Sequence, residues 1–433
     1  MSNKTRILSA LAIAVGMLML SYWVTNLSLA ISGETALIRK VELLRGWFKP
    51  HVNPLADSVL LINVAYDKEI IIAKDKKGKE VGYGGIVDRQ KLHQLLSELK
   101  NKDDSLYNEE HQHFYKYILL DVLFIDDVHT SQDSALFKLI ASMDRIAIAR
   151  DINSRMADTC LIAKAGLVNY DTDYKFVSFT KYPYLKKGKK SLPLKMYEEM
   201  TGHTITDHCL FANDGWRLAR RSIIPLFVLR CDSSYTQEGY KVWYNMGMDL
   251  LGSTYTYNDT TIKGKVQLYD NPALFKGKYK DKYQGKYRGK YIVIGAFSGG
   301  DMHYSYMESQ AGPVILFNAY LSLLHGHHMV SLWLFLLLLL VFFIMAYLIL
   351  NDLTIEVLLS KLPTPKNPVF AFFKRYFFIF VSWIGYSLLL SILCIFTYLA
   401  MGEVYDIFIT ATAFQLISMV AAKVKYKNKK SHA

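Results

Sequence analysis

The 433-residue sequence lacks the short cysteine, glycine and serine motifs that mark several large classes of protein. Its four cysteines are far apart and form no C-x-x-C pair, so neither a zinc ribbon nor a thioredoxin-type redox site is supported. No G-x-x-x-x-G-K-[ST] phosphate loop is present, and no nucleophile elbow stands out. We therefore expect a protein that is not an enzyme and that has neither a cofactor nor a bound metal.

Acidic residues are outnumbered by basic ones, with 38 Asp and Glu against 51 Lys and Arg, for a formal net charge of +13. Lysine and arginine are enriched on the cytoplasmic side of membrane spans, so part of this excess of basic residues is explained by the orientation of the spans in the membrane. We therefore expect contact with membrane lipid and no binding of nucleic acid.

Long apolar runs are plentiful, and their lengths of roughly 20 residues suit transmembrane helices. They cover residues 7–31, 329–350, 376–400 and 407–422. The first exceeds the apolar centre of a cleaved signal peptide, which favours a retained signal anchor over a removable export signal. The positive-inside rule places residues 1–6, the loop 351–375 and the basic tail 423–433 in the cytoplasm. Residues 32–328 and the turn 401–406 then lie on the other side.

The segment from residue 32 to 328 alternates short apolar strands with helical periodicity. The strands are DSVLLINVAYD, YKYILLDVLFIDD, RIAIARD and RGKYIVIGA, and helices follow the first two, one of them with Asp88 as its expected cap. Strand, helix, strand order predicts an α/β domain with a mainly parallel sheet and helices on its faces. The glycine-rich GYGG before the first helix is expected to form a turn, and residues 155–275 to elaborate the sheet.

Carboxylates gather at the predicted strand ends, where open α/β sheets place ligand sites. The candidates are Asp67, Asp121, Asp126, Asp127 and Asp301. Such residues can bind a ligand or a metal, or cap helices. No calcium-loop spacing is present, and the glycines of GAFSGGD are expected to form a tight turn.

Two further features leave alternatives open. His303, His325, His327 and His328 suit a metal or pH-sensing site, or an ordinary membrane-interface surface. Lys-Tyr recurs in FKGKYKDKYQGKYRGKY, which suits either an anionic envelope partner or a solvated strand edge protected by lysine. Cys160, Cys209 and Cys231 could pair outside the cytoplasm, although spacing does not say which of them do, and Cys394 lies in an apolar run.

Three motifs together resemble the extracytoplasmic sensory domain called CHASE type 2, found in bacterial membrane receptors. They are YILLDVLFIDD followed by QDSALFKLI, then GKYIVIGAFSGGDMHY, and finally GPVILFNAYLSLLHG running into a membrane span. The positions on or near the family pattern are Asp121, Gly295, Ala296, Asp301, Gly312, Asn318, Ala319 and Gly326. The sequence departs from that pattern at Ser305-Tyr306, where Thr-Pro is usual, and at Asn318, where histidine is common.

The resemblance implies a periplasmic sensory domain on the bacterial inner membrane, with Gly295 and Asn318 added to the aspartates as ligand-binding residues. Family members usually continue into a cytoplasmic kinase, cyclase or phosphodiesterase. This chain ends soon after its last span, so the expected partner is a separate cytoplasmic effector, with a small-molecule or anionic envelope ligand outside. A homo-oligomer is compatible with this. The alternatives are an assembly subunit of an envelope complex and, more weakly, an envelope enzyme using the strand-end aspartates.

Overall fold

The apolar segments singled out in the sequence form the central strands of a parallel sheet in the computed structural model of the chain. In spatial order the strands are β15 (Tyr244–Asn245), β1 (Val59–Asn63), β18 (Lys290–Gly295), β4 (Tyr115–Leu120), β5 (Ile146–Arg150) and β6 (Ala165–Leu167). Every neighbouring pair is parallel. The predicted α/β class with a parallel sheet is confirmed.

The structure describes residues 2–25, 37, 39–41, 58–74, 80–126, 128–169, 171–172, 178–186, 188–208, 211–223, 244–246, 255–257, 260–262, 288–297, 301–305, 308–353, 368–401 and 407–431.

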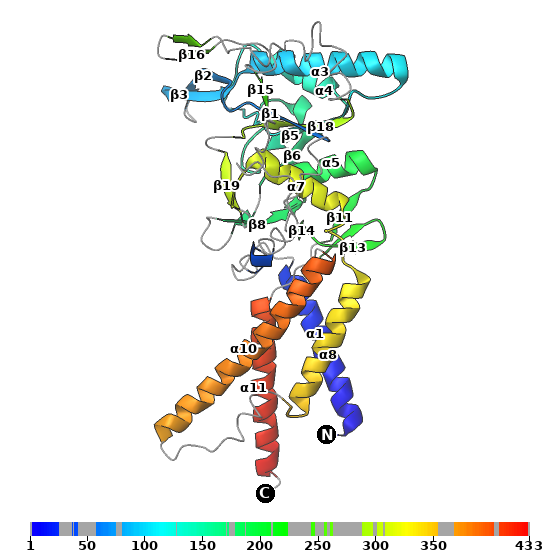
Figure 1. Ribbon diagram of the computed structural model, residues 1–433, viewed down its shortest axis with the longest axis vertical. Helices are drawn as coiled ribbons and strands as arrows, with labels where there is room; N and C mark the ends of the chain where they lie inside the picture. The colour runs from blue at the N-terminus through cyan, green and yellow to red at the C-terminus, as the bar shows by residue number, and fades with distance from the viewer. Residues whose placement is uncertain are drawn as a thin grey trace.

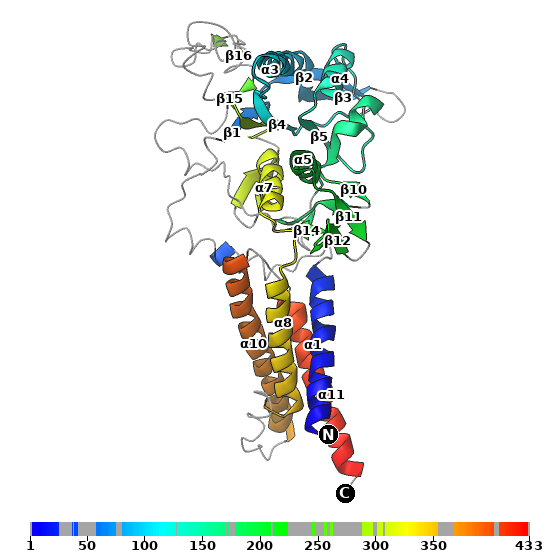
Figure 2. The ribbon, with the colours of Figure 1, turned by 90° about the vertical axis from the view of Figure 1, so that its right-hand side faces the viewer.

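Helices cover both faces of this sheet, as Figures 1 and 2 show. On the face away from the membrane helices lie α3 (Arg89–Glu110) and α4 (Asp133–Ser142), and on the other face lie α5 (Leu192–Thr201) and α7 (Gly312–Leu324). Alternate strand residues serve the two layers: Leu60 and Ile62 pack with α3 and α4, whereas Val59 and Leu61 belong to the core around α5 and α7. Burial on both faces explains why these strands are nearly continuous apolar runs.

Local signals fix the ends of the covering helices. Asp88 caps α3, as predicted, because its Oδ1 accepts the Lys91 N–H at 3.0 Å. The same helix ends at His111 in the left-handed conformation. Ser191 accepts the Leu194 N–H at the start of α5.

The remaining described strands are short and form small sheets around the central one. They are β2 (Lys68–Lys74) with β3 (Glu80–Val87); β9 (Leu185–Lys186) with β10 (Lys189–Lys190); β11 (Ile205–His208), β12 (Phe211–Asp214) and β13 (Arg217–Ala219); β7 (Asp171–Thr172), β8 (Ser178–Pro183), β14 (Ser222–Ile223), β19 (Met302–Ser305) and β20 (Glu308–Ala311); and β16 (Tyr255–Tyr257) with β17 (Thr260–Ile262). A 3-10 helix, η1 (Thr159–Lys164), precedes β6. The elaboration predicted for residues 155–275 thus includes several of these small antiparallel pairs.

The predicted turn at GYGG is wrong. Gly82, Gly84 and Gly85 lie inside β3, where they pair with β2 in an antiparallel hairpin. Glycine is tolerated in this hairpin because its surface faces solvent, so no side chain is needed for packing. At Gly82 glycine is also favoured by the backbone, whose φ of 144° other residues rarely adopt.

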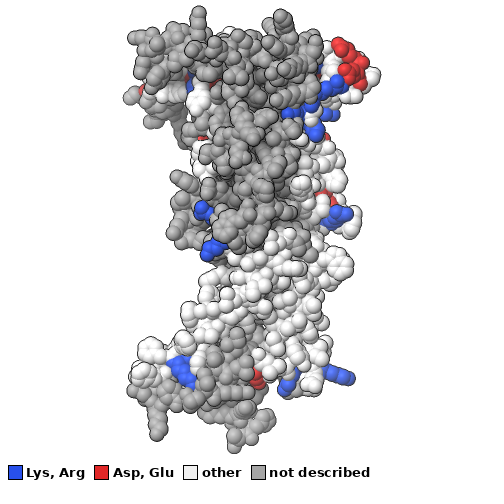
Figure 3. All heavy atoms as spheres, in the orientation of Figure 1, with Lys and Arg blue, Asp and Glu red and all other residues white. Residues whose placement is uncertain are grey.

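Four helices are long and apolar enough to cross a membrane: α1 (Asn3–Thr25), α8 (Leu332–Leu350), α10 (Pro368–Met401) and α11 (Ile407–Ser431). They correspond to the four apolar runs of the sequence and pack together in one bundle beneath the α/β domain (Figure 1). Figure 3 shows uncharged side chains covering most of the described bundle surface, with basic side chains near its lower end. Exposed apolar residues such as Leu332 and Leu340 suit contact with lipid.

The bundle and the lower half of the α/β domain share one hydrophobic core. Val293 in the sheet, Phe317 in α7, Phe342 in α8 and Phe414 in α11 belong to the same cluster of buried side chains. Cores are close-packed and transmit strain. The α/β domain is therefore in mechanical contact with the helices below it.

Candidate functional site

The first candidate site lies at the carboxyl ends of β1, β18 and β4. Strand β18 is inserted between β1 and β4, which precede it in the chain. Open α/β sheets bind ligands at the point where the strand order reverses in this way. The Asn63 side-chain oxygen accepts the N–H groups of Ala65 at 3.1 Å and Phe297 at 3.0 Å, and so holds the ends of β1 and β18 together.

Gly295 brings the start of α7 directly onto this sheet edge. A Cβ atom at Gly295 would lie 2.3 Å from Pro313 Cγ and 3.2 Å from Asp121 Cβ. Contacts below 3.0 Å essentially do not occur for real Cβ atoms, so only glycine fits between Asp121 and Pro313. The glycine is thus required by a close approach of α7 to the end of β18.

Asp301 lies at the other side of the same helix start. Its backbone oxygen accepts the Gly312 N–H at 3.0 Å, and its Oδ2 would be 2.7 Å from a Cβ at Gly312. His303 Nε2 lies 3.0 Å from Asp301 Oδ1. A carboxylate beside the first turn of a helix is favoured by the positive end of the helix dipole.

The charge of Asp301 affects the Asp121 carboxyl group. Asp121 is half-buried, and loss of hydration, together with repulsion from the charge of Asp301, raises the pKa of Asp121 well above its usual range. Asp121 therefore retains its proton at a pH where isolated carboxyl groups are ionised. A protonated Asp121 can donate a hydrogen bond as well as accept one.

We predict that Asp121→Asn stabilises the protein at high pH. Because the pKa of Asp121 is raised in the folded state, this residue costs no stability below the usual carboxyl pKa, where it is protonated in both states. The free energy of unfolding then falls as the pH rises from that usual value up to the folded-state pKa. A neutral amide avoids this, so the unfolding midpoint should rise at pH 8 and the gain should shrink toward pH 4, with about 2–4 °C for each kcal/mol. Thermal unfolding of the detergent-solubilised protein at both pH values measures it.

The matched control is Asp126→Asn, because Asp126 is exposed and its carboxyl group faces His129 instead of Asp301. Its midpoint should follow the unsubstituted protein at both pH values. A lower midpoint for Asp121→Asn than for the unsubstituted protein at pH 8 would contradict the assignment.

The other residues expected at the site are placed elsewhere. Asp67 is buried, and its Oδ1 accepts a hydrogen bond from Lys91 Nζ at 3.0 Å. Asp126 is exposed and faces His129 at 3.9 Å. Asn318 is buried within α7, where its amide donates to the Val314 oxygen at 2.8 Å. Asp127 lies outside the described residues, so of the predicted set the structure brings together Asp121, Gly295 and Asp301.

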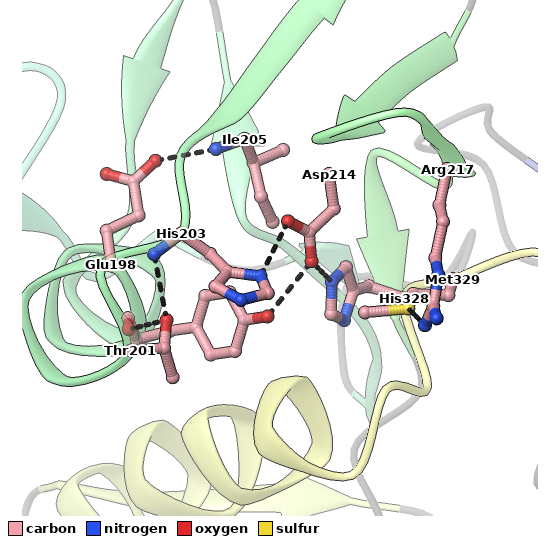
Figure 4. A network of polar contacts seen from close by, with 9 residues as sticks. Glu198, Thr201, His203, Ile205, Asp214, Arg217, His328 and Met329 are labelled. Carbon is pink, nitrogen blue, oxygen red and sulfur yellow. Dashed lines mark hydrogen bonds and ion pairs between the residues drawn. The ribbon is translucent and has the colours of Figure 1, made fainter.

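A second cluster, which the sequence analysis did not assemble, lies at the base of the α/β domain (Figure 4). Asp214 at the end of β12 is buried and accepts hydrogen bonds from Tyr197 Oη at 2.9 Å, His203 Nδ1 at 3.1 Å and His328 Nε2 at 3.0 Å. Tyr197 belongs to α5, and His328 lies between α7 and α8. Asp214 therefore connects three separate parts of the chain.

The protonation states in this cluster follow from burial and hydrogen bonding. Burial would raise the pKa of Asp214, but hydrogen bonds from His328, Tyr197 and His203 outweigh it and hold this pKa below its usual range. Burial lowers the pKa of His328, although its bond to Asp214 opposes the shift. Burial also lowers the pKa of His327 to about 4. A neutral His328 thus donates to an ionised Asp214 near neutral pH.

Backbone hydrogen bonds also hold the junction between the α/β domain and the helix bundle, which consists of β13, the end of α1 and residues 325–331. The Arg220 N–H donates to the His328 oxygen at 2.7 Å, and the Val330 N–H donates to the Leu218 oxygen at 2.9 Å. On the other side of β13, Tyr22 of α1 donates to the Ala219 oxygen at 3.0 Å. Strand β13 is therefore held between the end of α1 and the segment that leads into α8.

Of the histidines considered for a metal site, only His328 enters this cluster with His203, and both bond to Asp214. Among the described residues no three His, Cys, Asp or Glu side chains are arranged to hold a metal ion. Cys160 is exposed and Cys394 buried, both as free thiols, whereas Cys209 and Cys231 lie outside the described residues. Most of the Lys-Tyr run, residues 276–287, also lies outside them.

Comparison of the chain with protein-family models, with curated proteins and with solved structures finds no match. The resemblance to the CHASE type 2 domain therefore stays a prediction from the motifs.

Proposed function

We propose that the chain is a membrane-anchored receptor subunit, in which the α/β domain detects an envelope or small-molecule signal and the helix bundle passes it to a separate cytoplasmic protein. The observation that carries this proposal is the connection from α7 to α8. Helix α7 starts against Asp121 and Asp301, and the seven residues 325–331 separate its end from the start of α8 at Leu332.

Helix α7 is suited to carry a displacement. Every residue from Gly312 to Leu323 is buried, so the helix is held along its length and a shift at its first turn moves its far end. A ligand that neutralised or bridged Asp121 and Asp301 would change the packing of that first turn. The far end of α7 leads directly to His328.

A shift of α7 would act on the His328–Asp214 hydrogen bond, which lies just before the start of α8. Asp214 also accepts hydrogen bonds from Tyr197 and His203, so a displacement of His328 would break its own bond to Asp214 and change the set of donors around that carboxylate. Signal transfer by helix shifts requires two such discrete packings, with the ligand binding one of them better. The receptor proposal assigns these two states to the junction.

The proposed topology follows from the ends of the helices. Arg6 donates to Asn351 Oδ1 at 2.9 Å, so the start of α1 and the end of α8 lie at the same end of the bundle, and both termini are on that side in Figure 1. Lys4, Arg6, Lys374 and Lys423 lie toward it, and by the positive-inside rule this supports a cytoplasmic location for that end. The α/β domain would then be periplasmic, on a bacterial inner membrane.

We predict that a cytoplasmic protein copurifies with the full-length chain in mild detergent. Replacing the tail lysines by glutamine should remove it, since they offer the charge that the partner contacts; these are Lys423, Lys425, Lys427, Lys429 and Lys430. Quantitative mass spectrometry of the copurified proteins measures the effect.

A second pair of variants separates signalling from simple attachment. His328→Gln should change the amount of that partner about fivefold, as expected for a coupling free energy near 1 kcal/mol. His325→Gln is the control, because His325 is exposed and outside the Asp214 cluster. Copurification of envelope proteins alone, unaffected by the tail or by His328, would reject the receptor proposal.

That rejecting outcome would favour the second candidate, an assembly subunit of an envelope complex. One observation supports it: the β2–β3 hairpin exposes Ile70 and Tyr83, whose exposed fractions are 76% and 81%. Large exposed apolar side chains grouped on one element are typical of protein-contact surfaces.

A further inference from the structure

A cavity of about 280 Å³ lies at the β6 edge of the α/β domain, between the β5–β6 edge, β10 and helix α5. Helix α5, β5 and β10 are labelled in Figure 2, and β6 in Figure 1. Six of its eight lining residues are charged: Arg150, Lys189, Lys190, Lys195, Glu198 and Glu199, with Ala165 and Leu167 completing the wall. Pockets for drug-sized ligands start near 300 Å³, so this cavity suits a smaller molecule.

Both acidic groups of the wall already have partners. Glu198 accepts a hydrogen bond from Lys190 at 2.6 Å and one from the Ile205 N–H at 2.9 Å. Glu199 forms an ion pair with Lys195 at 3.2 Å and accepts the Tyr117 hydroxyl at 2.5 Å. The four charges of these two ion pairs therefore cancel within the wall.

Two cations remain. Within the described part of the chain, the side chains of Arg150 and Lys189 form no ion pair or hydrogen bond, and Arg150 Nε is buried without a hydrogen-bond partner. A buried nitrogen of a charged group that lacks a partner is unfavourable, and native structures rarely leave one so. A bound anion would supply the missing acceptor.

We propose that this cavity binds a small anion bearing a carboxylate or phosphate group, held by Arg150 and Lys189. Arginine presents paired N–H donors that match the two oxygens of either group, and lysine adds a point charge from the exposed β10 strand. Arg150 follows the last apolar residue of β5, so its backbone is fixed by pairing with β6. The site is distinct from the Asp121–Asp301 pair, where two carboxyl groups would repel such an anion.

The cavity is also one helix away from the membrane junction. Helix α5 carries Glu198 and Glu199 into the cavity wall and Tyr197 onto Asp214. A link between anion binding and the bundle would rest on the receptor function proposed above. Binding itself does not, so a failed pull-down and a failed titration are distinguishable results.

The test is isothermal titration of the full-length protein in mild detergent with inorganic phosphate and, separately, with succinate, at constant ionic strength. We expect at least one of the two to bind and Arg150→Gln to weaken that binding about tenfold or more, because the bidentate donor is lost. Lys189→Gln should weaken it about threefold. Lys138→Gln is the control, since Lys138 is exposed on α4, on the opposite face of the sheet, and should bind as the unsubstituted protein does.

Glu198→Gln tests the sign of the effect. It removes a negative charge from the wall and frees Lys190 while keeping an oxygen for the Ile205 N–H, so affinity should rise about threefold. A misfolded variant would not bind more tightly, and Lys189→Gln and Glu198→Gln decide the matter if Arg150→Gln fails to fold. The proposal is overturned if neither anion binds at millimolar concentration, or if all the variants bind like Lys138→Gln.

Discussion

Replacing Asp214 by alanine is expected to lower the free energy of unfolding by about 3–5 kcal/mol. The substitution leaves the hydroxyl of Tyr197 and Nε2 of His328 buried without an acceptor, and each orphaned buried donor costs about 1–3 kcal/mol. His203 loses a bond as well, but it is half-exposed and can bond to water instead. Denaturant unfolding of the detergent-solubilised protein measures the loss.

The same substitution should alter the junction more than the sheet. With Asp214 gone, the segment around His328 keeps its backbone pairing with residues 218–220 but loses the side-chain hydrogen bond that ties it to β12. We therefore expect amide hydrogen exchange to rise in residues 325–331 while β4 and β18 stay protected.

Asp126→Ala is the control for this effect, because Asp126 is exposed and should change stability by no more than about 0.5 kcal/mol. Asp214→Asn should fall between the two, since its amide keeps one acceptor oxygen but places an NH₂ group among donors. Equal unfolding curves for Asp214→Ala and Asp126→Ala would show that the cluster contributes nothing.

Gly295→Ala is the second substitution with a large expected effect, a loss of about 3 kcal/mol. Its methyl group would sit 2.3 Å from Pro313 Cγ, within a proline ring that cannot rotate away. Either the end of β18 or the start of α7 must shift, and overpacking of this kind costs about 1–3 kcal/mol or more. Thermal unfolding and limited proteolysis of the full-length chain report the change.

Gly85→Ala provides the matched comparison. A Cβ atom there would be 3.9 Å from Lys68 Cβ, an ordinary contact, and the residue has no positive φ. We expect it to leave stability unchanged or slightly increased. If both alanine variants unfolded alike, the close approach of α7 to β18 would not hold in solution.

The sequence predicts the frame of the fold well because that frame depends on local patterns. Apolar runs of five or six residues can be recognised as buried strands, and Asp88 before a helical pattern as a cap. Parallel strands also end at one edge of the sheet, so Asp121, Gly295 and Asp301 could be expected together. These inferences need only the order of the elements along the chain.

The parts that could not be predicted depend on long-range contacts. His328 and Asp214 are 114 positions apart, and Asp214 ends a four-residue strand in a region without clear periodicity. Lys189 and Lys190 form the short strand β10, whereas Arg150 ends β5, and whether their side chains line one cavity depends on how α5 packs. Asn318 was expected at the ligand site because of its place in a motif, but an amide inside a helix can bond to the carbonyl four residues earlier, and here it does.

The contact between α1 and α8 has a consequence for biosynthesis. About 300 residues separate the end of α1 from the start of α8, so at ribosomal speeds of about 5–20 residues per second α1 waits about 15–60 s for its partner. During that time Ala10 and Ala14, which are fully covered in the finished bundle, still lack the cover of α8 and α11. Small residues allow close helix approach in membranes, so the nascent α1 presents a ready contact to whichever insertion factor or neighbouring helix reaches it first.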